Sequence, residues 1–198
     1  MGYAEKEKQI YTFEEYIEME ANSELRYEFY QGEVFAMSGT TDRHNEIVLN
    51  TAFVLRGKLS KKPCRTYTES VKLEIDKKSF YTYPDVFVTC EPRDLEDSRV
   101  KRYPGLIVEV LSDSTEAYDR GFKWLKYKNI PSLKYYLLIS QKEMSLEVFT
   151  RSEDDKRLWL HRSYNQPEEE ITLSEYDLQF TLAQIYEGLT WEENDKEV

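Results

Sequence analysis

Two short apolar runs stand out in the hydrophobic pattern of the chain. One reads Pro-Asp-Val-Phe-Val-Thr-Cys at residues 84–90, and the other reads Gly-Leu-Ile-Val-Glu-Val-Leu-Ser at residues 105–112. Short apolar runs bounded by Pro, Gly or Ser are typical of strands near the middle of a sheet. Each run contains one acid, Asp85 or Glu109. Burying a carboxylate is costly unless a cation pairs with it, so both acids are candidate functional residues.

Side-chain alternation shows how the two acids can meet. In a strand, Asp85 shares a face with Phe87, and Glu109 shares a face with Ile107 and Leu111. If the two strands are neighbours, one pairing register brings both acids to the same face near one end of the sheet. Alternation permits this register and does not fix it.

The rest of the pattern predicts helices and strands on both sides of these runs. In chain order they are a helix at 12–19 with a capping box, a β-hairpin at 26–37, an amphipathic helix at 42–61, a half-exposed strand at 65–75 followed by a turn at 76–79, a helix at about 115–129, a strand at 133–139, an antiparallel pair at 144–151 and 157–164, and a last helix at 182–188. A strand, a helix and a strand in succession imply a right-handed crossover and a parallel pair. We therefore expect an α/β (α+β) fold with a mixed central sheet flanked by helices, an N-terminal β-hairpin and a C-terminal antiparallel extension.

Composition narrows the class of protein. The chain has 198 residues, 40% of them hydrophobic, and no apolar run approaches the ~18 residues of a membrane span. We expect one domain at 12–190, with disordered tails at 1–11 and 191–198. The charged N-terminus shows no secretory signal, which predicts a cytoplasmic protein without a membrane partner.

The formal net charge of −11 restricts how the chain can bind nucleic acid. Phosphate neutralisation by Lys and Arg supplies most of the affinity in such complexes. An acidic protein must therefore use a local basic patch, a bound divalent cation or a partner.

The two cysteines and the two histidines give no familiar metal-binding spacing. Cys64 and Cys90 form no CxxC pair, and Cys90 lies in an apolar run, so we expect buried free thiols rather than a disulfide or a zinc site. His44 stands at the start of the helix at 42–61, where it is either a hydrogen-bonding residue or a ligand. Glu28 lies among aromatic residues and is either a surface acid or part of a site.

Several separated motifs together resemble one known family. They are Pro84-Asp85, Glu109 in an Ile-Val-Glu-Val-Leu-Ser strand, Ser114-Thr115, Asp119-Arg120 with Lys123, and upstream Tyr27-Glu28, Gly32-Glu33 and Arg43-His44-Asn45. This set, which spans about 12–136, resembles the Uma family of restriction-endonuclease-like proteins, a branch of the PD-(D/E)XK nuclease superfamily. The resemblance implies a restriction-endonuclease-like fold with a metal-dependent site at one end of the sheet.

The resemblance also assigns roles to residues. Asp85 and Glu109 would bind Mg²⁺ or Mn²⁺, and the metal would activate a water molecule for attack on the phosphodiester bond of DNA. The superfamily places a lysine two residues after the glutamate, but Leu111 occupies that position here. The lysine expected to replace it is Lys123, with Asp119, Glu28 and His44 as supporting candidates. The competing interpretation is that Asp119 and Lys123 form an ordinary surface ion pair.

Two functions from different classes follow. The first is a Mg²⁺- or Mn²⁺-dependent DNA endonuclease, which we expect to act as a homodimer because such folds often cut two strands. The second is a catalytically inactive nuclease-fold module for binding or assembly, which Leu111 favours slightly. A zinc hydrolase has little support because two histidines and two scattered cysteines offer no ligand set.

Overall fold

In the computed structural model, which describes residues 9–37 and 39–191, the two apolar runs form neighbouring antiparallel strands, β6 (Val86–Thr89) and β8 (Leu106–Leu111). They belong to a six-stranded sheet. Its spatial order is β11 (Trp159–Tyr164), β10 (Leu146–Arg151), β9 (Tyr135–Ser140), β8, β6 and β3 (Arg65–Thr68). The β8–β9 pair is parallel and the other neighbours are antiparallel, which confirms the mixed sheet.

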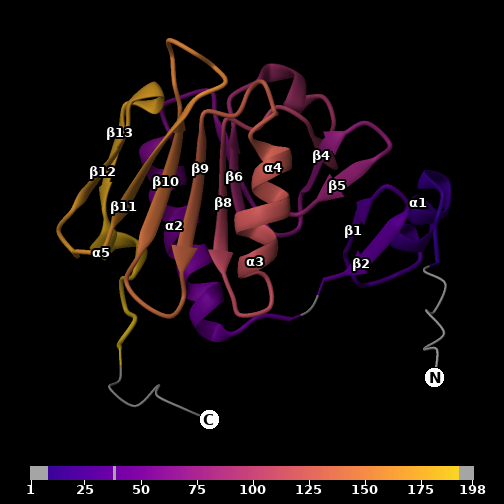
Figure 1. Cartoon of the computed structure of the whole chain (residues 1–198), viewed down its shortest axis with the longest axis horizontal. Helices are drawn as coiled ribbons and strands as arrows, with labels where there is room; N and C mark the ends of the chain where they lie inside the picture. The colour runs from indigo at the N-terminus through magenta and orange to yellow at the C-terminus, as the bar shows by residue number, and fades with distance from the viewer. Residues whose placement is uncertain (1–8, 38, 192–198) are drawn as a thin grey trace, which may run out of the picture.

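Helices cover both faces of this sheet (Figure 1). The face that carries Val108 and Val110 packs against α2 (Asp42–Lys58). The opposite face carries Ile107 and Leu111 and packs against the helical segment after β8. That segment consists of α3 (Glu116–Tyr118), a π-helical turn (Asp119–Lys123) and α4 (Trp124–Tyr127). The alternation predicted for the Glu109 strand is therefore confirmed.

The N-terminal part forms a second sheet beside the first (Figure 1). Helix α1 (Phe13–Ala21) begins at the predicted capping box, in which Thr12 and Glu15 bond reciprocally. The hairpin of β1 (Tyr27–Tyr30) and β2 (Glu33–Ala36) turns at Gly32, whose φ of 91° favours glycine. The five-stranded order is β2, β1, β5 (Phe80–Thr82), β4 (Lys72–Asp76) and β7 (Val100–Lys101).

The single strand predicted at 65–75 is wrong, because the structure divides it into β3 and β4. One long hairpin is split between the two sheets. Its outer half pairs β4 with β5 in the five-stranded sheet, and its inner half pairs β3 with β6 in the six-stranded sheet. The chain crosses between the sheets at Glu69 and again at Asp85, and the Glu69 N–H donates to the Asp85 carbonyl at 3.2 Å. These two residues therefore mark the bend of the hairpin.

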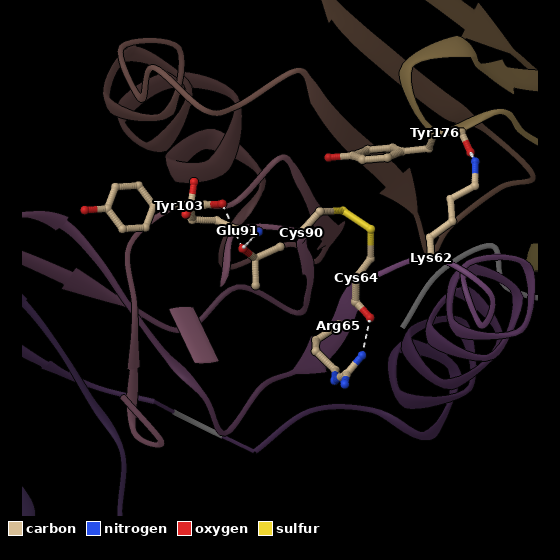
Figure 2. Close-up of a disulfide and its surroundings, with 8 residues drawn as sticks. Lys62, Cys64, Arg65, Cys90, Glu91, Tyr103 and Tyr176 are labelled. Carbon is tan, nitrogen blue, oxygen red and sulfur yellow. Dashed lines mark hydrogen bonds between the residues drawn. A yellow bond between two sulfur atoms is a disulfide. The ribbon is translucent and has the colours of Figure 1, made fainter. Parts of the chain in front are cut away.

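The prediction of free thiols is also wrong, because Cys64 and Cys90 form a disulfide (Figure 2). Arg65 pairs with Thr89 in the β3–β6 ladder, so the antiparallel register places the preceding and following cysteines opposite each other. The bridge closes the inner end of the split hairpin. The spacing of 26 residues does not reveal this pairing until the register is known.

The C-terminal region contains the predicted antiparallel pair, β10 and β11, and one hairpin that was not predicted. That hairpin joins β12 (Glu170–Leu173) to β13 (Leu178–Thr181), and its alternate apolar side chains pack onto the α2 face of the large sheet. The last helix, α5, is shorter than predicted, at Leu182–Ile185. Two 3₁₀ turns lie at Pro92–Leu95 and Ser174–Tyr176.

The predicted tails are only partly described. Trp191 packs against the core, 5.6 Å between ring centroids from Tyr186, and the Tyr11 N–H donates to the Gly32 carbonyl at 2.8 Å. Both residues thus make contacts within the described part of the chain, and the predicted disorder of the tails stays a prediction. The rest of that prediction, at 1–8 and 192–198, lies outside the described residues. Within the described part of the chain, every helix is too short or too polar to cross a membrane.

Candidate active site

A cavity of about 740 Å³ opens where the split hairpin bends from one sheet to the other. Its walls carry acidic side chains from both sheets and from the helical segment after β8. The predicted site residues that line it are Glu28, His44, Asp85, Glu109, Asp119 and Lys123. The structure thus brings together every site residue that the sequence predicted.

Asp85 lies at the bend, immediately before β6, with a side chain that is 17% exposed. Its Oδ2 accepts a hydrogen bond from the Val110 N–H at 2.6 Å, which anchors the carboxylate to the neighbouring strand β8. Its Oδ1 lies 3.3 Å from Nε2 of His44. One oxygen of Asp85 is therefore held by the sheet, and the other faces the first turn of α2.

Glu109 lies in the middle of the same sheet and is 2% exposed. Its Oε1 accepts from the Tyr127 hydroxyl at 2.9 Å and lies 3.1 Å from Nζ of Lys123. Its Oε2 accepts from the Asp85 N–H at 3.4 Å. Glu109 therefore meets Asp85 in the register that alternation permits, but it is enclosed by donors where Asp85 is partly open.

Lys123 is buried, with three carboxylates around its ammonium group. Its Nζ lies 3.0 Å from Asp119, 3.1 Å from Glu109 and 3.7 Å from Glu28. Asp119 is 2% exposed and Lys123 is 6% exposed, so the interpretation of this pair as a surface ion pair is wrong. Glu28 is itself buried in β1 and accepts a hydrogen bond from the Thr82 hydroxyl.

A π-helical turn positions this lysine. The Trp124 N–H donates to the Asp119 carbonyl, five residues back, which widens the helix across Asp119–Lys123. The Asp119 carbonyl also accepts from the Tyr136 hydroxyl at 3.1 Å, which ties the wide turn to strand β9. Leu111, in the usual lysine position of the superfamily, is packed in the apolar cluster below. The cation therefore reaches Glu109 from the helix rather than from the strand.

Burial sets the protonation of this cluster. It raises the pKa of Glu109 well above its usual value, against the opposing charge of Lys123. Burial raises the pKa of Asp119 in the same way. For Lys123, burial works against the charged form, but Glu109, Glu28 and Asp119 outweigh it and raise its pKa well above the usual value. The ammonium group therefore stays charged beside Glu109 and Asp119, which hold protons more tightly than usual.

His44 and Glu69 extend the site on the other side of Asp85. Burial lowers the pKa of His44, but the hydrogen bond and charge of Asp85 outweigh it and raise the pKa overall. Burial and the charge of Asp85 raise the pKa of Glu69. One ligand atom from each of His44, Glu69 and Asp85 lies within 4.8 Å of the others.

Two residues of this site were missed in the sequence. Glu69 was placed inside a strand, although the polar triplet Thr68-Glu69-Ser70 between two apolar stretches is a signal for a break. Tyr127 follows Lys123 by four residues and Asp119 by eight, so helical spacing places it on the same side of the helix. Its hydroxyl reaches Glu109, as that spacing allows.

Comparison with known proteins identifies relatives of the whole domain. Residues 13–184 match the Uma2 family, described as "Putative restriction endonuclease". The Synechocystis sp. protein slr1290 is 35% identical over 178 residues, which cover 90% of this chain and 92% of that protein. A second Synechocystis protein, sll1609, is 33% identical over 153 residues, which cover 76% of this chain and 85% of its own.

A solved structure shares the fold. The crystal structure described as a putative nuclease from Anabaena variabilis superposes with a TM-score of 0.70 at 14% identity and covers 88% of this chain and 96% of its own. At that identity the likeness shows the fold, and it confirms the restriction-endonuclease-like architecture. The family match over most of the chain, together with two relatives above 30% identity, shows that this chain belongs to the Uma2 family.

Proposed function

We propose that this protein is a metal-dependent endonuclease that hydrolyses phosphodiester bonds of DNA. Membership of the Uma2 family supports a nuclease-like function. The observation that carries the proposal further is the 3.1 Å contact between Nζ of Lys123 and Oε1 of Glu109. It supplies a lysine beside the acidic pair although Leu111 occupies the usual position.

The donor set around Asp85 and Glu109 suits Mg²⁺ or Mn²⁺. Both ions prefer carboxylate oxygens, and the two acids stand side by side on neighbouring strands at one wall of the cavity. In each acid the shortest hydrogen bonds go to one oxygen only. Val110 holds Oδ2 of Asp85, and Tyr127 and Lys123 hold Oε1 of Glu109. The other oxygen of each acid is the one we expect to bind the metal. A divalent ion held there would polarise the phosphate and lower the pKa of a bound water molecule.

The side chains around the pair have distinct tasks. Tyr127 fixes the orientation of the Glu109 carboxylate from below. Lys123 remains protonated, so it offsets negative charge that develops on the phosphate and orients the attacking water. Asp119, on the same wide turn, holds the ammonium group in place from the opposite side. These residues prepare the charge distribution before the substrate arrives.

The acidic character of the chain limits how DNA approaches. The formal net charge is −11, and six acids line the cavity against Lys123 and His44. They are Glu28, Glu69, Asp85, Glu109, Asp113 and Asp119. A divalent ion held by Asp85 and Glu109 would also reduce the repulsion between the cavity and the phosphate.

Plasmid cleavage tests the proposal. We expect the wild-type protein to nick supercoiled DNA with Mn²⁺ or Mg²⁺ and to stop when EDTA removes the metal. Asp85→Asn should lower the rate by at least ~10³-fold, about 4 kcal/mol of transition-state stabilisation. Asp154→Asn, in the exposed turn between β10 and β11, is the matched control and should cut like wild type. Metal binding by wild type without cleavage of any DNA would favour the inactive binding module.

A further inference from the structure

Three potential ligands lie together at the wall of the cavity. His44 comes from the first turn of α2, Glu69 from the bend between β3 and β4, and Asp85 from the start of β6. One ligand atom from each lies within 4.8 Å of the others. The Oδ1 atom of Asp85 faces this group, because Oδ2 is bonded to the Val110 N–H. Asp85 therefore connects the two sides of the cavity.

The hydrogen bonding of the His44 ring is incomplete. The residue is 8% exposed, and its Nδ1 is buried without a hydrogen-bond partner among the described residues. Its Nε2 lies 3.3 Å from Oδ1 of Asp85, a long separation for a strong charge-assisted bond. The backbone at His44 is fixed at the start of α2, since the Thr41 hydroxyl accepts from the backbone N–H of His44 at 3.2 Å. Nε2, the ring nitrogen that faces Asp85, is therefore the atom that would bind a cation there.

The backbone of Glu69 is strained at the same position. Its φ is 33°, in the left-handed region that residues other than glycine rarely adopt. Such a conformation costs about 1–3 kcal/mol and persists where the surroundings impose it, which happens most often at functional sites. Here the strained turn directs a half-buried carboxylate to the wall of the cavity beside Asp85.

We propose that His44, Glu69 and Asp85 together bind one divalent cation, and that the imidazole nitrogen makes this site prefer a first-row transition ion such as Mn²⁺ over Mg²⁺. Nitrogen donors favour transition ions, whereas carboxylates and water suit Mg²⁺ equally well. The inference rests on the proposed function because it shares Asp85 as a ligand. It adds a nitrogen ligand, the Glu69 carboxylate and a metal preference on the Asp85 side of that site.

Electron paramagnetic resonance of bound Mn²⁺ gives the most direct test. We expect the wild-type protein to show a hyperfine coupling from a ligand nitrogen and His44→Ala to lack it. Calorimetric titration should show Mn²⁺ binding at least ~10-fold tighter than Mg²⁺ in wild type. His44→Ala should lower only the Mn²⁺ affinity by a similar factor, and Glu69→Gln should lower both affinities.

The chain offers a matched control. His161, the second of its two histidines, is exposed on β11 and lies 2.8 Å from Glu147, so His161→Ala should leave Mn²⁺ binding and the nitrogen coupling unchanged. The wild-type spectrum by itself decides the nitrogen ligand, so the test does not depend on the folding of a variant.

The outcomes separate this inference from the proposed function. Mn²⁺ binding without nitrogen coupling, lost in Asp85→Asn and Glu109→Gln but unchanged in His44→Ala, would overturn the inference and leave the nuclease proposal standing. Nitrogen coupling in a protein that cuts no DNA would support the inference and count against the nuclease. A wild-type protein that binds neither ion would overturn both.

Discussion

Asp85 and Glu109 occupy neighbouring strands, yet their surroundings are opposite in kind. Glu109 lies in the centre of the six-stranded sheet, where Lys123 and Tyr127 enclose it. Asp85 lies at the bend where the hairpin passes between two sheets, with His44 and Glu69 as its neighbours. One acid belongs to a closed, hydrogen-bonded cluster, and the other belongs to a partly open group of potential ligands.

The difference shows how one sheet can provide both rigidity and access. Strand β8 is hydrogen-bonded to β6 on one side and to β9 on the other. The backbone at Glu109 therefore cannot move without breaking hydrogen bonds between strands. Asp85 stands where the β3–β6 ladder ends, and its position depends on the bend at Glu69 and on the Val110 N–H. We therefore expect changes around Glu109 to affect charge and catalysis, and changes around Asp85 to affect ligand binding and local order.

Removing the cation from the closed cluster should have the largest effect. Lys123→Met leaves three carboxylates near one another without their shared partner, because the ammonium group contacts Asp119, Glu109 and Glu28. Breaking a buried pair in this way costs about 3–5 kcal/mol of folding stability. We expect DNA cleavage to fall by ~10²–10³-fold as well. Urea denaturation and plasmid nicking measure the two effects.

The control for this variant is Lys126→Met, on the same helix. Its ammonium group lies over the Tyr30 ring, 4.8 Å from the centroid, and it has no part in the cluster. It should change stability by about 1 kcal/mol or less. Equal losses in the two variants would show that Lys123 has no special place in the site.

Opening the Cys64–Cys90 bridge should act mainly on the Asp85 side. The cysteines are 26 residues apart, and a loop of that size predicts a loss of about 3.5 kcal/mol on reduction. Urea denaturation with and without a phosphine reductant measures the loss. Hydrogen exchange should then rise in β3 and β6 before it rises in β8 and β9, because the bridge closes the β3–β6 ladder.

The double variant Cys64→Ala/Cys90→Ala is the control for this measurement, since its unfolding midpoint should not respond to reductant. An unchanged midpoint in the wild-type protein would mean that the bridge adds nothing to stability. Disulfides are rare in reducing compartments. Because the sequence predicts a cytoplasmic protein, repeating the experiment in a cell extract tests whether the bridge forms there.

Deleting the Tyr127 hydroxyl should have the smallest effect. Tyr127→Phe removes the 2.9 Å hydrogen bond to Glu109 and should lower stability by about 1.5 kcal/mol. Mn²⁺ affinity should change less than ~3-fold, because Asp85, His44 and Glu69 keep their positions. The control variant is Tyr30→Phe, which also removes a tyrosine hydroxyl. The Tyr30 ring packs against Phe80 and Phe122. A large loss of metal affinity in Tyr127→Phe would show that the two acids are not separate environments.

The sequence predicted the parts of the fold that rest on local periodicity. Alternation placed Glu109 on the correct face of its strand, and the capping box placed the start of α1. Alternation also predicted that Asp85 can lie near Glu109, provided that their two strands pair in one particular register. These predictions succeeded because hydrophobic spacing and helix caps are properties of short segments.

What the sequence did not show depends on contacts between distant segments. The split of 65–75 into two strands follows from competition between two sheets, which strand periodicity does not express. The disulfide follows from the β3–β6 register, and the burial of Asp119 and Lys123 follows from packing of the wide turn on the sheet. The predicted homodimer stays a prediction, because it concerns contacts between chains.

The wide turn at Asp119–Lys123 has a consequence for the evolution and redesign of this protein. A π-helical turn holds one residue more than a regular turn, and each residue rotates an α-helix by about 100°. Deleting Gly121, which has open space where a side chain would begin, would restore regular winding and place Lys123 three residues after Asp119, a spacing that still keeps both side chains on one side of an α-helix. The wide turn thus lets the chain hold one extra residue between the acid and the lysine without turning the lysine away from the acid.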